Sequence, residues 1–75
     1  MTINDLKVNK IYLNQDNYRG IGLEQVVQIN ADLYFKTVKC IKNYHWPLNN
    51  YQRIDPDIEL TTIRELTPLE KLKYL

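Results

Sequence analysis

The chain has 75 residues, of which 44% are hydrophobic and 25% are charged, and its formal net charge at pH 7 is +1. These values are typical of a folded domain and exclude a disordered chain. At this length a protein buries about 60% of the surface that its unfolded chain exposes, and one core supplies roughly 3–5 kcal/mol of net stability. We therefore expect one domain over residues 1–75, with no room for a second.

Several kinds of chemistry are excluded by residues that the sequence lacks. It contains no serine and only two glycines, which rules out a serine hydrolase and a glycine-rich phosphate loop. The single cysteine, Cys40, and the single histidine, His45, are too few for a zinc site, and Cys40 has no partner for an internal disulfide. Their spacing does not establish a nucleophile and its base. We expect a protein that is not an enzyme and that holds no cofactor and no metal.

The N-terminal residues predict neither export nor membrane insertion. Residues 1–10 include Asp5 and lack an apolar run of the length of a signal peptide, and the other apolar stretches are only a few residues long. The sequence therefore predicts a soluble cytoplasmic protein with no membrane partner.

In chain order, the first predicted element is a short strand over residues 10–13. Ile11 and Leu13 alternate on one face of this strand, as expected for a half-buried strand. Residues 14–17 are rich in asparagine and aspartate, which favour turns, so a turn is expected there.

The longest pattern predicts a β-hairpin over residues 21–41. The first strand has a period of two, with one side expected to be buried and interrupted only by Gln25. The side expected to be buried consists of Ile21, Leu23, Val27 and Ile29. The opposite side consists of Gly22, Glu24, Val26 and Gln28. Residues 33–41 are rich in β-branched and aromatic residues, and residues 30–32 form a connector of hairpin length. The second strand alternates less regularly, which a bulge or burial on both faces would explain.

Two further elements are expected after the hairpin. Ile58 and Leu60 alternate, but Ile63 and Leu66 resume out of phase, which indicates a bulge or strand break at residues 61–62.

The clearest local signal lies at the C-terminal end. Thr67 and Glu70 have the spacing of a capping box, and Pro68 occupies the first helical position, where its missing N–H costs nothing. This pattern predicts a short helix over residues 68–75. Its three leucines form an apolar face at positions 69, 72 and 75, and so short a helix must pack on the barrel or on a partner.

Three segments resemble parts of SH3-like barrels. Residues 6–12, Leu-Lys-Val-Asn-Lys-Ile-Tyr, resemble the first strand and tight turn, and residues 26–29 and 34–38 resemble the central hairpin. The resemblance covers roughly residues 6–66, although Asn9 stands where many such domains have a glycine. It implies a mainly β fold, a small SH3-like antiparallel barrel of four to five strands with a short C-terminal helix. This architecture serves protein, peptide and nucleic-acid partners alike.

Positive charge and aromatic side chains concentrate in the middle of the chain. Residues 33–54 carry a charge of +4 with no acid, whereas residues 1–32 sum to −1 and residues 55–75 to −2. Five of the eight aromatic residues lie in this basic island. The candidate partner-binding residues are Lys36, Lys39, Lys42, Tyr44, His45, Trp46, Tyr51 and Arg53.

Each part of this set also has an ordinary structural interpretation. Trp46 lies in a turn-rich segment, where it would either cover one end of the barrel or anchor a partner. The three lysines would alternate between the faces of a strand, which also fits a solvated surface.

The first functional hypothesis is a non-catalytic protein-binding module. Its partner would be a larger host or phage protein, including a ribonucleoprotein, and direct docking would inhibit that partner. Ile, Asn, Lys and Tyr, which have AT-rich codons, are frequent in this chain, so its gene is expected to be AT-rich. In its size, this coding bias and its lack of catalytic residues, the chain is similar to anti-CRISPR and other anti-defence proteins of phages. The second hypothesis is a small nucleic-acid-binding barrel that uses the basic and aromatic residues of segment 34–53.

A separate hypothesis is a homodimer formed through residues 68–75.

Overall fold

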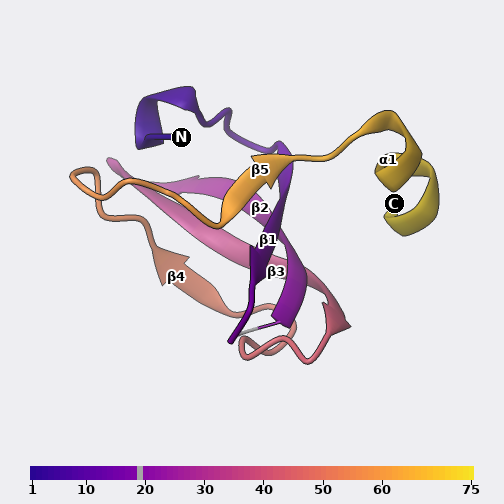
Figure 1. The fold of residues 1–75 in the computed structure, drawn as a ribbon. Coiled ribbons are helices and arrows are strands. Elements are labelled where there is room, and N and C mark those ends of the chain that lie inside the picture. The colour runs from indigo at the N-terminus through magenta and orange to yellow at the C-terminus, as the bar shows by residue number, and fades with distance from the viewer. Residues whose placement is uncertain (19) are drawn as a thin grey trace.

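The computed structural model describes residues 1–18 and 20–75, and it contains five antiparallel strands in one open sheet (Figure 1). The strand order is β4-β3-β2-β1-β5, so β4 and β5 are the two edges. The prediction of a mainly β fold with a short C-terminal helix is confirmed. The elements are a 3₁₀ helix η1 (Ile3–Asp5), β1 (Ile11–Asp16), β2 (Gly20–Ile29), β3 (Asp32–Lys42), β4 (Tyr51–Arg53), β5 (Ile63–Glu65) and the helix α1 (Pro68–Tyr74).

The predicted hairpin is confirmed as β2 and β3. Its connector is shorter than predicted, because Asp32 pairs with Ile29 and leaves only Asn30 and Ala31 between the strands. Asn30 has a φ of 56°, a left-handed conformation that asparagine adopts more readily than most residues. The irregularity predicted for this hairpin is also confirmed, since the β2–β3 register shifts twice between residues 21 and 24.

The strands differ from the predictions in three places. The turn predicted at residues 14–17 is wrong over 14–16, because these residues continue β1 and pair with β2. Residues 58–60 form a bend and irregular backbone instead of a strand, and β5 starts only at Ile63, after the break predicted at residues 61–62. No sequence pattern predicted β4.

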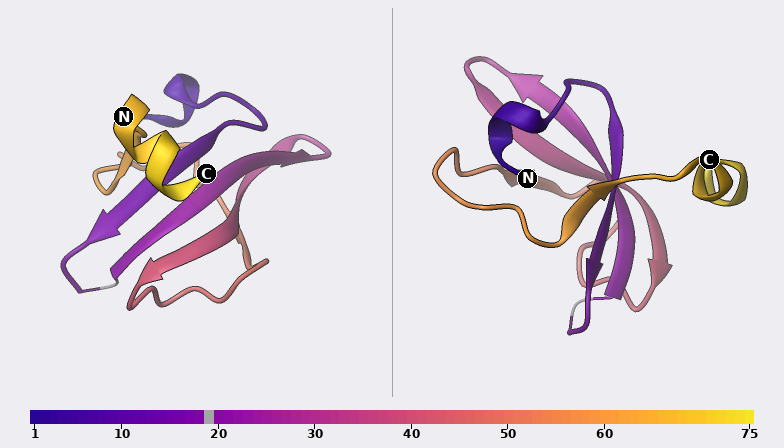
Figure 2. Two further views of the ribbon diagram at one scale, coloured as in Figure 1. Left: turned by 90° about the vertical axis from the view of Figure 1, so that its right-hand side faces the viewer. Right: turned by 45° about the horizontal axis from the view of Figure 1, so that its top comes forward.

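Both faces of the sheet carry a hydrophobic core. On one face Tyr12, Val26 and Ile63 are buried, and on the other Leu13, Leu23 and Leu66 are buried. The two views in Figure 2 place η1 and α1 on opposite sides of the sheet. This arrangement matches their contacts, because residues 1 and 6 pack on the first core and residue 74 packs on the second.

The two-sided core corrects the prediction for β2. Its supposedly outer side is as buried as the inner one, since Gly22, Glu24 and Val26 are all buried, while Ile29 is 45% exposed. The physical reason is position: β2 lies between β1 and β3 at the centre of a sheet that is covered on both faces.

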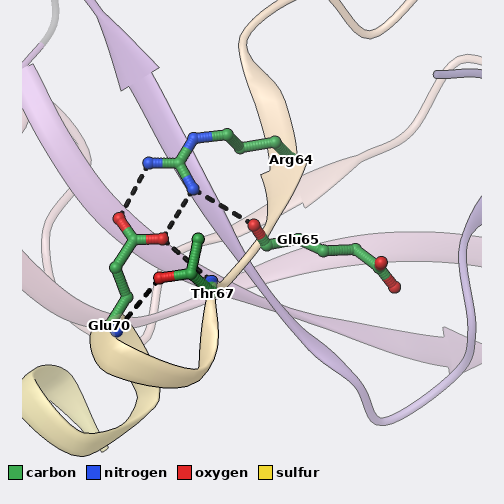
Figure 3. A network of polar contacts seen from close by, with 4 residues as sticks. All are labelled: Arg64, Glu65, Thr67 and Glu70. Atoms are coloured by element: carbon green, nitrogen blue, oxygen red, sulfur yellow. Dashed lines mark hydrogen bonds and ion pairs between the residues drawn. The ribbon is translucent and has the colours of Figure 1, made fainter.

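The helix α1 is held to the sheet by polar contacts. Thr67 and Glu70 form the predicted capping box, in which each side chain accepts a hydrogen bond from the other residue's backbone N–H. The guanidinium of Arg64 donates two hydrogen bonds to the Glu70 carboxylate, at 2.6 and 2.8 Å (Figure 3). At the other end of the helix, Lys39 Nζ donates to the carbonyl of Tyr74 at 3.0 Å.

The leucines in α1 and directly after it do not pack on the sheet. Leu69, Leu72 and Leu75 are 75%, 83% and 62% exposed, so the apolar face predicted for this helix points to solvent. Among the described residues, no helix is long and apolar enough to cross a membrane.

The Arg64–Glu70 contact predicts an unusual titration. The hydrogen bonds from Arg64 lower the pKa of Glu70 to about 2. The stabilisation that the Glu70 carboxylate gives to α1 is therefore complete above the ordinary carboxyl pKa and is lost as the pH falls toward 2. We expect Arg64→Gln to raise this pKa toward the ordinary value, whereas Lys73→Gln, which removes the same charge from another position, leaves it low. Carboxyl ¹³C chemical shifts followed over pH measure both, and an unchanged Glu70 titration in Arg64→Gln would contradict the assignment.

Candidate binding surface

Four residues of the basic island share one face of the β3–β4 pair. Tyr34 pairs with Arg53, and Lys36 pairs with Tyr51. Directly opposite residues of an antiparallel pair lie on the same face, and so do residues two apart along one strand. We call Tyr34, Lys36, Tyr51 and Arg53 the basic–aromatic surface.

The basic–aromatic surface combines tyrosine rings with cations. Tyr51 is 49% exposed, and Lys36 Nζ lies 5.8 Å from the centroid of its ring, a cation–π geometry. Arg53 forms an ion pair with Asp32 at 3.4 Å, and both side chains are about half exposed. Because exposed pairs of this length contribute little, Arg53 stays available to an acidic partner.

The other predicted binding residues lie elsewhere. Lys39 is exposed but is directed to the end of α1, and Lys42 and His45 are exposed near the end of β3. Tyr44 and Trp46 are half-buried in the segment that follows β3. The structure therefore divides the basic island, and only part of it forms one surface.

Tyr44 folds back over the centre of the sheet. Its ring lies so close to Gly22 that a Cβ added there would be 2.4 Å from two ring carbons. Its hydroxyl donates a hydrogen bond to Glu24 Oε1 and accepts one from Asn14 Nδ2 at 2.8 Å. Tyr44 thus ties the segment after β3 to both β1 and β2.

Glu24 is the buried carboxyl group of this network. Its side chain is 2% exposed, and Oε1 also accepts a hydrogen bond from the Thr37 hydroxyl at 2.8 Å. Burial raises the pKa of Glu24, and the hydrogen bonds from Tyr44 and Thr37 oppose that rise only in part. Burial and the neighbouring Glu24 also raise the pKa of Tyr44. Glu24 Oε2 and Asn14 Oδ1 are buried with no hydrogen-bond partner among the described residues.

A cavity of about 340 Å³ opens between the two edges of the sheet. Residues near β4 and β5 line it together, and its largest apolar walls come from Phe35, Trp46, Ile58, Leu60 and Ile63. Trp46 is held in place partly through its carbonyl, which accepts a hydrogen bond from Cys40 Sγ at 3.3 Å. Trp46 therefore forms a wall of an open cavity. In this position it is neither a fully buried cover for one end of the sheet nor a fully exposed anchor for a partner.

The network around Glu24 was missed by the sequence analysis, which placed Glu24 opposite the predicted buried side. One signal was present, because an isolated glycine within a strand, here Gly22, often marks a close approach of another group. In the part of the chain that the structure describes, no three His, Cys, Asp or Glu side chains are grouped to hold a metal ion.

Comparisons with known proteins give no relative for this chain. No protein-family model, curated protein or solved structure matches it. The function is therefore inferred from the geometry of the surface and the cavity.

Proposed function

We propose that this chain is a non-catalytic protein-binding module that docks through the basic–aromatic surface onto an acidic region of a larger protein. The observation that carries the proposal is that Tyr34, Lys36, Tyr51 and Arg53 share one face at the edge of the sheet. Tyrosine and arginine are enriched at the centres of protein interfaces, where they supply contact area and charge.

A protein partner is favoured over nucleic acid by the charges that remain available. Of the four cations of the basic island, only Lys36 and Arg53 share one face, and Lys39 is engaged by the Tyr74 carbonyl. Two cations on one face make few contacts with a run of phosphate groups. The sequence pI is about 7.8, whereas dedicated nucleic-acid-binding domains usually exceed about 9. The exposed leucines of α1 add apolar surface, which suits a protein partner.

The proposed setting follows the sequence analysis. The strand order β4-β3-β2-β1-β5, in which β5 returns to pair with β1, supports an SH3-like barrel that is open between β4 and β5. We propose that the protein acts in the cytoplasm as an inhibitor from a phage or mobile element, docking on a host protein or ribonucleoprotein.

Nucleic acid remains the second candidate partner because of one specific contact. Lys36 lies over the exposed ring of Tyr51, and such a pair can stack a base while it meets a phosphate.

Capture of partners with matched charge variants tests the proposal. The bait is the full chain as wild type, as Lys36→Glu/Arg53→Glu, or as Lys7→Glu/Lys73→Glu, which makes the same change in charge away from the surface. We expect a protein to bind the wild type and the control, and its recovery to fall at least about tenfold with the surface variant, because the loss of two charge-assisted contacts costs about 1.5 kcal/mol or more. The lysate is treated with nuclease first.

Two results would contradict the proposal. Equal recovery with both variants would show that binding does not use the basic–aromatic surface. Binding that disappears after nuclease treatment would favour nucleic acid, and titration of labelled single-stranded RNA at roughly 50 and 200 mM salt would then show steep salt dependence.

A further inference from the structure

The edge of β4 offers backbone hydrogen-bonding groups in a defined pattern. Along this strand the Asn50 carbonyl accepts from Thr37 N–H, and Ile54 N–H donates to the Leu33 carbonyl. Backbone groups alternate in direction along an antiparallel strand, so the N–H and C=O groups of Tyr51 and Arg53 point away from β3. No strand pairs with this side of β4 in the described part of the chain.

The two faces beside this edge differ in chemistry. On one face lies the cavity, which combines apolar walls with polar residues; its lining includes Gln52, the central residue of β4, and extends to the next residue, Arg53. On the other face, Tyr51 and Arg53 belong to the basic–aromatic surface, together with Lys36. The cavity, at about 340 Å³, lies in the size range that accepts one large side chain or a small ligand.

We propose that β4 binds an extended segment of the partner as a sixth strand, and that this segment alternates acidic and apolar residues. The partner residue opposite Gln52 lies on the cavity side and inserts an apolar side chain. The residues opposite Tyr51 and Arg53 lie on the other side, where carboxylates meet Lys36 and Arg53. An added strand gains affinity from backbone hydrogen bonds and specificity from alternate side chains.

This inference rests on the proposed function and names the form of the protein partner. The apolar walls and the charged face explain why alternation, and not composition alone, is recognised. A one-residue shift would place carboxylates in the cavity and apolar groups beside the cations.

Two labelled peptides of identical composition test the alternation. One is Glu-Val-Glu-Phe-Glu-Val-Glu, and the other has the same residues in blocks, Glu-Glu-Glu-Glu-Val-Phe-Val, both with blocked ends. Fluorescence anisotropy with the full chain should show the alternating peptide binding at least about tenfold more tightly. Equal affinities, or no binding of the alternating peptide at about 1 mM protein, would overturn the proposal.

Two pairs of variants locate the peptide. Tyr51→Pro removes an outward N–H at an edge position where proline is tolerated, and Tyr51→Ala removes the ring but keeps the N–H. Ile58→Glu places a charge at the cavity mouth, and Val8→Glu changes a similarly exposed aliphatic residue that does not line the cavity; the two are 54% and 44% exposed.

We expect the first member of each pair to bind the alternating peptide at least about fivefold more weakly than the second, with circular dichroism confirming that all four variants fold. Equal affinity within either pair would overturn this edge as the site. A partner protein whose capture depends on Lys36 and Arg53, but not on Tyr51 N–H or Ile58, would leave the proposed function intact and reject only the added strand.

Discussion

Gly22→Ala is expected to lower the free energy of unfolding by about 1–3 kcal/mol, a typical cost of overpacking a filled core. The added methyl group would lie 2.4 Å from the ring of Tyr44, so the ring must move away. That movement would also separate the Tyr44 hydroxyl from Glu24 and Asn14, which it now joins. Urea denaturation followed by circular dichroism measures the loss.

A double-mutant cycle tests whether Tyr44 is the cause. In a Tyr44→Ala background the space above Gly22 is empty, so Gly22→Ala should cost less than about 0.5 kcal/mol. Tyr44→Ala itself is expected to cost about 3 kcal/mol, close to the whole stability of a domain of this size. All four proteins are therefore measured in the same stabilising osmolyte. If Gly22→Ala costs the same in both backgrounds, the proposed role of the Tyr44 ring is wrong.

Glu24 is expected to make the protein less stable as the pH rises. Because burial raises its pKa in the folded state, its favourable contribution is complete below the ordinary carboxyl pKa and is lost as the pH rises through the folded-state value. When Glu24 ionises, Oε2 remains buried without a donor, and such a group costs about 1–3 kcal/mol. We expect Glu24→Gln to resemble the wild type near pH 4 and to exceed it by about that amount at pH 8.

The comparison is made as a difference between the two proteins at each pH. Glu65 and Glu70 have lowered pKa values, so their protonation destabilises the fold as the pH falls, not as it rises. Both residues are present in both proteins, so their effect cancels in the difference. Asp57→Asn removes an exposed carboxylate and controls for the change in net charge. A difference between wild type and Glu24→Gln that does not grow with pH would show that Glu24 is not held as the neutral acid.

The elements that could be predicted from the sequence are those whose signals are local. The capping box of Thr67 and Glu70 and the alternation through residues 21–41 depend on neighbours along the chain, and both elements formed as expected. β4 could not be found in this way, since only three residues form it and its pairing with β3 holds it in place.

The candidate surface likewise depends partly on local sequence signals and partly on contacts between distant residues. Lys36, Tyr51 and Arg53 could be selected by composition, but their common face depends on the register of β3 with β4. Tyr44 was selected for the same reason, yet its ring packs on Gly22 because the chain turns directly after β3, where Asn43 has a φ of 49°. Burial of Glu24 depends on that packing, which is distant in sequence and has no pattern of its own.

The order of the strands also bears on how the chain folds. Strands β1 to β3 each pair with the next strand along the chain, whereas β5 must return to β1, where Glu65 lies opposite Tyr12. Joining segments so far apart carries the larger loop-closure entropy, so docking of β5 is expected to come last. Until then the outer edge of β1 is unpaired, and a chain at high concentration can join to another there before it completes its own sheet.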